Sequence, residues 1–391
     1  MASQADRDRE ERIRRLLDLL RAEATDQADT VRPFVATEFT DPVLARQERD
    51  LIFGKVPSIV AHSSELASPN DFVTVQMPRN RIIVVRQKDG SVKSFVNACR
   101  HRGALLEERP AGRCRLFSCG YHRWSYDLDG SLRAVTYEET FGEIDRAKSG
   151  LVELPTEERH GFVWVVDSAA GSIDVQAWLG PEMDAALEGY GLDKLVSFRY
   201  ETFDEPANWK VMQDAFLDGY HIKYAHPNTA GKIIHTNILA VEDYGRHARF
   251  LSARKTLDRW LEEDTTGQSL VKDVTESHFV GPNSTLLKLP DHFELLTFRP
   301  HPADPGRCAM QMRLIVPSVA DFGRSEQDWA KRWEKNWQIL MDVLYEEDFP
   351  LLRASQLALQ SADTGGMVIG RNEVVNQIFH RETWRLLGAG S

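Results

Sequence analysis

Cysteine is scarce in this sequence of 391 residues. The four cysteines, Cys99, Cys114, Cys119 and Cys308, are too few for a disulfide framework in a chain of this length. The composition therefore fits a reducing compartment, and the cysteines need an explanation other than disulfide bonding.

Long apolar runs and an excess of basic residues are also missing. No stretch approaches the roughly 20 apolar residues that span a bilayer, and Met1 to Arg15 is charged without the apolar region of a signal peptide. The 48 basic against 59 acidic residues give a formal charge of -11, whereas phosphate binding favours a concentrated basic surface. We therefore expect a soluble, cytoplasmic protein that binds neither nucleic acid nor a membrane.

The length predicts two compact domains, each large enough to bury its own core. Leucines and Ile13 recur among charged residues over 5–27, which predicts an amphipathic helix. We expect a helical segment over 1–39, an all-β domain over 40–165 and a second domain over 166–391. After a short helix at 46–53, the first domain should contain strands at 72–77, 81–86, 94–97, 116–118 and 161–166.

The second domain mixes strands and helices. Its expected strands are 198–203, 248–256, 293–300 and 309–317. Residues 329–360 read as a long helix that Pro350 should kink or interrupt, because proline cannot donate the helical hydrogen bond.

Two short motifs in the first domain combine thiols with imidazoles. Cys99-Arg100-His101 is followed, after seventeen residues, by Cys119-Gly120-Tyr121-His122. Two thiolates and two imidazoles can close a tetrahedral zinc site, or hold a [2Fe-2S] cluster with both cysteines on one iron and both histidines on the other. Each loop offers one Cys and one His, unlike the Cys-pair and His-pair spacing of zinc fingers, and this favours the cluster.

The segments 97–103 (NACRHRG) and 119–126 (CGYHRWSY) closely resemble the two loops of Rieske proteins, in particular those of the large subunit of Rieske non-haem iron oxygenases. Gly120 stands where proline is common in that family. Arg123 stands where glycine usually follows the second histidine, and glycine there can adopt a positive φ that arginine resists. Cys114 and Cys308 lie off the motif and are interpreted as structural thiols.

Acids and histidines also gather in helix-like sequence over 208–227. On one helix Asp214, Asp218 and His221 would share a face, because they are spaced four and three apart. His226 would lie about 140° around that helix from His221. Pro227 disfavours helical geometry at the preceding residue, and the resulting distortion could swing His226 back toward a metal.

The resemblance covers most of the chain and implies a second metal centre. By it, His221 and His226 are two ligands of a ferrous iron, completed by a carboxylate from a long helix near the C-terminus. Asp348 is our choice for that ligand, with Glu347 the runner-up. A 2-His-1-carboxylate set leaves open positions for oxygen beside substrate.

Other residues of the 208–227 segment have further expected roles. By the resemblance, Asp218 bridges His221 to His122 of a neighbouring subunit in a head-to-tail homotrimer. Asn208 and Asp214 should either line the iron pocket or cap and solvate the helix.

The fold that the resemblance implies is α+β: an all-β Rieske domain followed by a curved antiparallel sheet that grips a long helix. The implied activity is that of a terminal oxygenase, which hydroxylates an organic substrate with O2 and with NAD(P)H electrons delivered by a separate reductase, sometimes through a ferredoxin. No G-x-G-x-x-G fingerprint follows a strand, so the reductase should be another chain. A small β subunit could accompany the trimer.

Hydroxylation of an aromatic substrate is the commonest activity of this family. Steroid hydroxylation, O- or N-demethylation and quaternary-amine oxidation use the same metal sites, although aspartate rather than glutamate at position 218 disfavours the quaternary-amine branch. The substrate cavity should be built from residues 230–300 and 307–317. Two other classes of function are alternatives. An electron-carrying Rieske ferredoxin would need only the two Cys–His motifs, and a zinc-stabilised binding module would have no redox role.

Overall fold

The computed structural model describes residues 4–263, 265, 268–361 and 363–388. Contacts between Cα atoms divide the chain into two compact units, one of residues 47–197 and one that combines residues up to 46 with those from 198 onward. Among the described residues, no helix is both long and apolar enough to cross a membrane. The α+β class expected from the sequence is confirmed.

The unit of residues 47–197 is built from short antiparallel strands. A five-stranded sheet has the order β10-β5-β4-β3-β6, and two three-stranded sheets have the orders β11-β12-β2 and β7-β8-β9. The strands are β2 (Ser58–His62), β3 (Asp71–Gln76), β4 (Arg81–Arg86), β5 (Val92–Val96), β6 (Ala111–Arg113), β7 (Phe117–Ser118), β8 (Ser125–Tyr126), β9 (Leu132–Ala134), β10 (Glu153–Leu154), β11 (Thr156–Arg159) and β12 (Phe162–Val165). The helical segments are η1 (Glu48–Phe53), η2 (Ser63–Leu66), α4 (Glu138–Phe141), α5 (Val175–Tyr190) and η3 (Leu192–Lys194).

Strand β4 is buried on both faces, which explains its continuous apolar run. Ile83 and Val85 belong to one hydrophobic cluster, while Ile82 and Val84 belong to another. Alternate side chains of a strand point to opposite faces, so a strand between two cores needs apolar residues at successive positions, and β-branched residues suit a strand. The first of these clusters also contains Cys99 and Cys119 and therefore supports the two Cys–His loops.

The segment after β12 packs with the strands of this unit. Asp184 of α5 accepts two hydrogen bonds of 2.6 Å from Arg159 and lies 2.7 Å from the Nε2 atom of His160. By their contacts, residues 166–197 therefore belong to the same unit as residues 47–165. The sequence instead predicts that they belong to the second domain.

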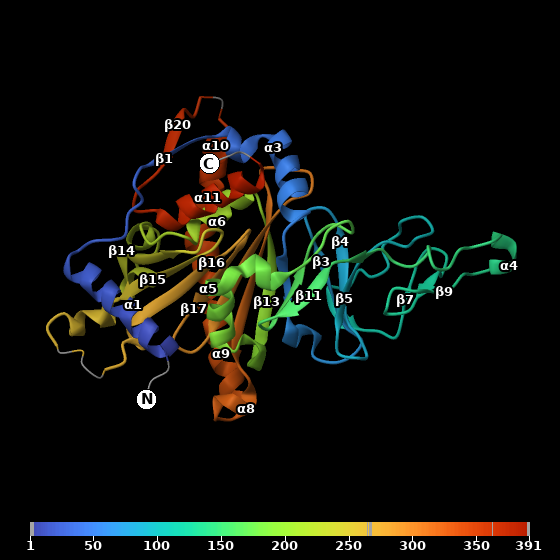
Figure 1. Ribbon diagram of the computed structural model, residues 1–391, viewed down its shortest axis with the longest axis horizontal. Helices are drawn as coiled ribbons and strands as arrows, with labels where there is room; N and C mark the ends of the chain where they lie inside the picture. The colour runs from blue at the N-terminus through green and yellow to red at the C-terminus, as the bar shows by residue number, and fades with distance from the viewer. Residues whose placement is uncertain (1–3, 264, 266–267, 362, 389–391) are drawn as a thin grey trace. The chain divides into compact units, whose positions relative to one another are not determined.

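The other unit contains a seven-stranded sheet of order β13-β19-β18-β17-β16-β15-β14 and a two-stranded ribbon, β1-β20 (Figure 1). Its strands are β1 (Arg32–Val35), β13 (Leu195–Glu205), β14 (Ile234–Asp243), β15 (Ala248–Arg254), β16 (Val274–Val280), β17 (Ser284–Lys288), β18 (Phe293–Pro300), β19 (Cys308–Pro317) and β20 (Gly366–Ile369). Successive strands from β14 to β19 pair antiparallel.

This unit also contains helical segments. They are α1 (Gln4–Arg21), α2 (Thr37–Thr40), α3 (Pro42–Gln47), α6 (Trp209–Ala215), α7 (Ile222–Ala225), η4 (Ala230–Lys232), η5 (Lys255–Trp260), η6 (Val271–Asp273), α8 (Val319–Phe322), α9 (Glu326–Val343), η7 (Leu344–Asp348), α10 (Phe349–Leu359) and α11 (Val374–Leu386). Helix α1 packs its leucines beside β14 and β15, where Leu251 and Ala253 share one face (Figure 1).

The opposite face of the sheet carries α6 and α11. Gln213 of α6 donates a 2.6 Å hydrogen bond to Thr285, and Phe379 of α11 contacts Phe279. Thr285 and Phe279 pair directly across β16 and β17, and their face is the one that α1 does not cover. Helix α6, which leads into the segment that carries His221 and His226, is thus held on this face of the sheet.

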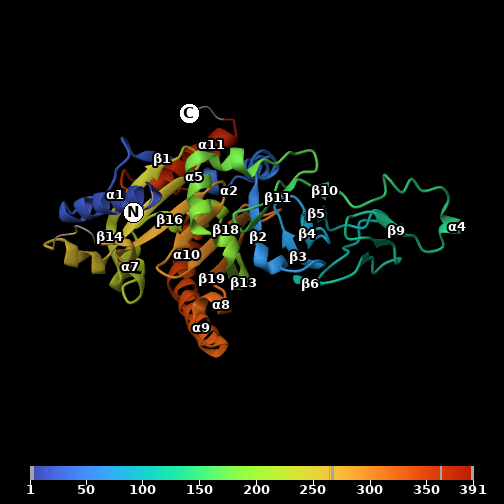
Figure 2. The same cartoon turned by 60° about the horizontal axis from the view of Figure 1, so that its bottom comes forward.

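The long helix expected over 329–360 is divided in a specific way. Helix α9 ends at Val343, a π-helical turn covers Leu344–Asp348, and α10 begins at Phe349 (Figure 2). Pro350 lies in the first turn of α10, where the missing N–H costs no hydrogen bond. The interruption that the sequence predicts is therefore present, and the acidic run at 346–348 falls within the π turn.

Candidate metal centres

The two Cys–His motifs form two similar tight turns. In the first, the Cys99 N–H donates to the Ala104 carbonyl and the Gly103 N–H donates to the Cys99 carbonyl, both at 2.8 Å. In the second, the Cys119 N–H donates to Trp124 at 2.8 Å and the Arg123 N–H donates to Cys119 at 3.0 Å. Each turn therefore presents one thiol and one imidazole from a closed backbone loop.

Residue 123 adopts the conformation that glycine usually supplies. Arg123 has φ +58°, and Gly103 has φ +75° at the matching place in the first turn. The arginine therefore accepts the left-handed conformation, at a cost of roughly 1–2 kcal/mol that the surrounding hydrogen bonds offset.

Polar side chains other than the four candidate ligands hold the first turn in place. The Asn97 carbonyl oxygen accepts hydrogen bonds from the N–H groups of Leu106 and Glu107, at 3.0 and 3.1 Å. The Tyr126 hydroxyl accepts from the Arg100 N–H at 2.9 Å and lies 3.3 Å from the Cys99 sulfur. Sequence reasoning gave Asn97 and Tyr126 no such role, because neither is a metal ligand by type.

The two imidazoles of these loops lie side by side. The ring centroids of His101 and His122 are 4.8 Å apart, and Trp124 stacks on His101 at 5.1 Å. The Nδ1 atom of His122 is buried and has no hydrogen-bond partner within the part of the chain that the structure describes. A buried nitrogen without a donor or acceptor is costly unless it binds a ligand, so the site fits a metal group.

The four residues fit a two-metal cluster better than a single ion. A tetrahedral zinc ion with bonds of about 2.0–2.3 Å would bring its ligand atoms within about 4 Å of one another. Among the described residues, no three of Cys99, His101, Cys119 and His122 place their ligand atoms within 4.8 Å of one another. A [2Fe-2S] cluster separates its two pairs of ligands and suits this wider arrangement.

The acids and histidines of the 208–227 segment do not lie on one helix, contrary to the expectation. Helix α6 ends at Ala215, and α7 begins only after His221. Asp218 is in the turn between them, where one oxygen accepts hydrogen bonds from the N–H groups of Tyr220 and His221, at 2.7 and 3.0 Å. Such a local side-chain bond competes with the helical hydrogen bond, which explains the break.

His221, His226 and Asp348 nevertheless converge. Each offers one ligand atom, and these atoms lie within 4.8 Å of one another, the one such group of three among the described residues. His226 follows α7 with φ -119° and ψ 48°, a non-helical conformation before Pro227. Two imidazoles and a carboxylate are the donor set of a facial triad, so the residues fit a mononuclear iron.

Each of these imidazoles has its Nδ1 atom engaged by a carboxylate. Asp218 lies 2.9 Å from the Nδ1 atom of His221, and Glu347 lies 2.6 Å from that of His226. A carboxylate accepts only when the ring nitrogen carries a proton, so the Nε2 atoms are left as the metal-binding atoms. Burial lowers the pKa of His226, but hydrogen bonds and charges from Asp348 and Glu347 outweigh it and raise the pKa.

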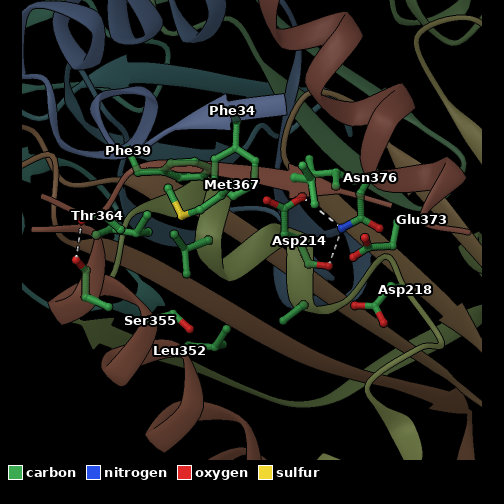
Figure 3. A pocket seen from close by; sticks show the side chains of 16 residues that line it. Phe34, Phe39, Asp214, Asp218, Leu352, Ser355, Thr364, Met367, Glu373 and Asn376 are labelled. Atoms are coloured by element: carbon green, nitrogen blue, oxygen red, sulfur yellow. Dashed lines mark hydrogen bonds between the residues drawn. The ribbon is translucent and has the colours of Figure 1, made fainter. Parts of the chain in front are cut away.

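A cavity of about 410 Å³ is lined in part by Asp218, which contacts His221. Figure 3 shows Asp214, Asp218, Glu373 and Asn376 on one side of it, with phenylalanines and methionine on the other. Asp214 accepts hydrogen bonds from Asn376 at 3.0 Å and lies 2.9 Å from the buried Nε2 atom of His380. Burial and the nearby charges of Asp218 and Asp214 raise the pKa of Glu373.

The other residues that the sequence analysis singled out, Asn208, Cys114 and Cys308, have contacts or burial typical of structural residues. The Asn208 side chain caps α6 by accepting from the Lys210 N–H at 2.9 Å and donates to the Phe39 carbonyl at 2.9 Å. Burial raises the pKa of Cys114 to about 11, and it raises the pKa of the fully buried Cys308 thiol still further above the ordinary value. Both thiols are therefore protonated and poor metal ligands at neutral pH.

Two family profiles match this chain. The Rieske [2Fe-2S] domain matches residues 57–149, and the catalytic domain of the ring-hydroxylating alpha subunit matches residues 192–389. The chain combines a β domain that carries two Cys–His loops with a helix-grip domain that carries two histidines and an aspartate. This combination is typical of the class of Rieske non-haem iron oxygenases. The chain belongs to the family of ring-hydroxylating alpha subunits.

Individual relatives differ in the substrates for which they are named. The oxygenase subunit of carnitine monooxygenase from Acinetobacter baumannii is 33% identical over 206 residues, 52% of this chain and 55% of that protein. The large subunit of anthranilate 1,2-dioxygenase from Acinetobacter baylyi is 33% identical over 202 residues, 50% of this chain and 43% of that protein. The chain thus spans about half the length of the curated relatives it matches.

A solved structure reproduces the fold over nearly the whole chain. The crystal structure of a quaternary ammonium Rieske monooxygenase with L-carnitine has a TM-score of 0.75 at 23% identity. The match covers 93% of this chain and 97% of that chain. At this identity the likeness concerns the fold alone.

Proposed function

We propose that this chain is the terminal oxygenase component of a multicomponent Rieske oxygenase. Cys99, His101, Cys119 and His122 would hold the [2Fe-2S] cluster, and His221, His226 and Asp348 would hold the mononuclear iron. When bound, the cluster relays single electrons, and the iron offers open positions at which O2 meets substrate. The convergence of His221, His226 and Asp348 carries the proposal, because an electron carrier has no use for it.

The residues around the iron position its ligands. Asp218 holds the Nδ1 atom of His221 at 2.9 Å. We propose that Asp218 also reaches His122 of a neighbouring subunit, which makes it a link between the two centres in a head-to-tail homotrimer. Electrons would come from NAD(P)H through a separate reductase, with or without a ferredoxin.

An aromatic compound is our preferred substrate class. The relatives include dioxygenases named for anthranilate and naphthalene, and aspartate at 218 is the residue that disfavours the quaternary-amine branch. Hydroxylation or demethylation of a non-aromatic substrate is the second candidate, and the similarity to carnitine monooxygenase favours it. By function, we assign residues 40–165 to the cluster and 166–391 to the iron, although residues 166–197 pack with the first unit.

Metal analysis of the purified protein tests the two centres. We expect close to three irons and two acid-labile sulfides per chain, and a Rieske-type EPR signal after dithionite reduction that survives removal of one iron. Two irons without a third would leave only an electron carrier, and zinc without sulfide would refute both sites.

Turnover with 18O2 and a surrogate reductase tests the activity. Two labelled atoms in the product of an aromatic substrate would establish dioxygenation. One labelled atom in a product from L-carnitine, with no aromatic turnover, would replace the preferred substrate class by the second.

A further inference from the structure

The imidazole of His226 lies between two neighbouring carboxylates. Its Nδ1 atom is 2.6 Å from Glu347, and its Nε2 atom is 3.3 Å from Asp348. The side chain of His226 is only 5% exposed, and that of Asp348 is 6% exposed. One ring therefore meets one acid at each nitrogen, in surroundings that largely exclude water.

The π-helical turn Leu344–Asp348 supplies both carboxylates. The side chains of successive residues of an α-helix point about 100° apart, so two of them seldom contact opposite sides of one small group. The wider turn between α9 and α10 lets Glu347 and Asp348 approach opposite edges of one ring. Glu346, the next acid in the same run, is exposed instead.

A hydroxyl also holds the carboxylate of Glu347. The Thr229 hydroxyl donates to the same Glu347 oxygen at 2.6 Å. Thr229 follows His226 in the turn after α7, and its N–H donates to the His226 carbonyl at 3.3 Å. The loop that carries the histidine therefore also orients the acid that contacts that histidine.

We infer that Glu347 is a positioning residue for the mononuclear iron and is not one of its ligands. By accepting the Nδ1 proton of His226, it keeps the Nε2 lone pair directed at the ion, and Thr229 keeps the accepting oxygen in place. Glu347 thus matches the arrangement of Asp218 on His221. The inference rests on the proposed iron site and adds a residue to which sequence reasoning gave only a runner-up role as ligand.

Iron affinity tests this assignment without recourse to turnover. The dissociation constant for Fe2+ is measured by chelator competition on protein that retains its Rieske cluster. We expect Glu347→Ala to weaken Fe2+ binding about 10- to 100-fold. Glu347→Gln should recover most of the loss, because its amide oxygen can accept from both His226 and Thr229.

Two further variants complete the series. Thr229→Val removes only the hydroxyl and should weaken Fe2+ binding in the same direction by a smaller factor. Glu346→Gln changes the neighbouring exposed acid and should leave the dissociation constant unchanged. The Rieske absorbance and the melting temperature report whether each variant is folded.

The outcomes separate the assignment from its rivals. If Glu347 were the ligand, Glu347→Gln would lose iron as completely as His226→Ala, while Asp348→Asn would retain it. Equal affinities for Glu347→Ala and Glu346→Gln would overturn the positioning role. A wild-type protein that binds no third iron would instead refute the proposed function itself.

Discussion

At the scale of single residues, the proposed cluster ligands include buried groups that suit a metal cluster. His122 has a buried Nδ1 atom that no described residue satisfies, and Cys99 and Cys119 are buried free thiols. An unsatisfied buried nitrogen is costly unless a ligand takes it up, whereas a buried thiol packs like a small apolar side chain and is available to a metal.

We therefore expect His122→Ala to abolish the visible absorbance and the EPR signal of the Rieske cluster, because one iron loses a ligand. Cys114→Ala is the matched control, since this thiol packs against the same hydrophobic cluster but lies off the motif. An unaltered Rieske spectrum in His122→Ala would exclude this residue as a ligand.

Asp218 has a different proposed role, because it contacts His221, a proposed iron ligand, and is not itself a proposed ligand. Asp218→Asn should leave the iron and sulfide contents intact while lowering turnover roughly 10- to 100-fold. Steady-state turnover together with metal analysis checks this expectation. Full activity in the variant would refute a role for Asp218 between the two centres.

At the scale of elements, a short helix outside the motifs contacts His101, a proposed cluster ligand. Phe141, the last residue of α4, contacts His101 edge to face at 5.3 Å and Trp124 at 5.2 Å. Arg146 ties this segment down through two hydrogen bonds to Glu138, at 2.7 and 2.6 Å. The ring covers part of the His101 imidazole.

We expect Phe141→Ala to raise the reduction potential of the cluster. Reduction adds a negative charge, and water admitted beside His101 would stabilise the more charged state. A redox titration followed by EPR measures the shift. Phe141→Tyr retains the ring and should stay close to the wild-type potential, and an unchanged potential in Phe141→Ala would show that the ring does not shield the cluster.

The helices also show where a prediction from local sequence spacing was wrong. The spacing of Asp214, Asp218 and His221 suits one helix face, but the hydrogen bonds of Asp218 end the helix and separate these residues. Asp214 instead contacts Asn376 and His380 of α11, more than 160 residues away in sequence. A periodicity argument cannot include such partners, because they belong to a different segment of the chain.

At the scale of the whole molecule, stability should depend on the ionisation of buried acids. Asp167 is fully buried, and burial raises its pKa to about 6, although Asn80 and the Arg79 N–H donate to it at 2.7 and 2.6 Å. The raised pKa means that the folded state holds this proton more tightly than the unfolded state does. Its stabilising contribution is present below pH 4 and is lost as the pH rises through 6.

The melting temperature of Asp167→Asn relative to wild type should therefore rise between pH 5 and pH 7.5. Between the pKa of Asp167 in the unfolded state and that in the folded state, the free energy of unfolding changes by about 3 kcal/mol in all. For Asp184, hydrogen bonds from Arg159 lower the pKa, so its contribution is lost only as the pH falls below about 4. Asp184→Asn should show a difference from wild type that stays constant over the same range, and a constant difference in Asp167→Asn would contradict the prediction.

The sequence by itself determined the chemistry and most of the strands. The Cys-x-His and Cys-x-x-His motifs depend on neighbouring residues of a loop, and their spacing already favours a Rieske cluster over zinc. Strands such as 81–86 and 293–300 were predicted within the observed bounds, because their apolar and β-branched runs are local properties.

Only the tertiary structure decided how distant acids are shared among the histidines. Residues 346–348 are three adjacent acids in sequence, and nothing local assigns Glu347 to the Nδ1 atom of His226 and Asp348 to its Nε2 side. That choice depends on the π turn between α9 and α10 and on the loop after α7, which lie more than 100 residues apart. Long-range packing sets this geometry, so the pattern of residues could name the candidates but could not give each one its place.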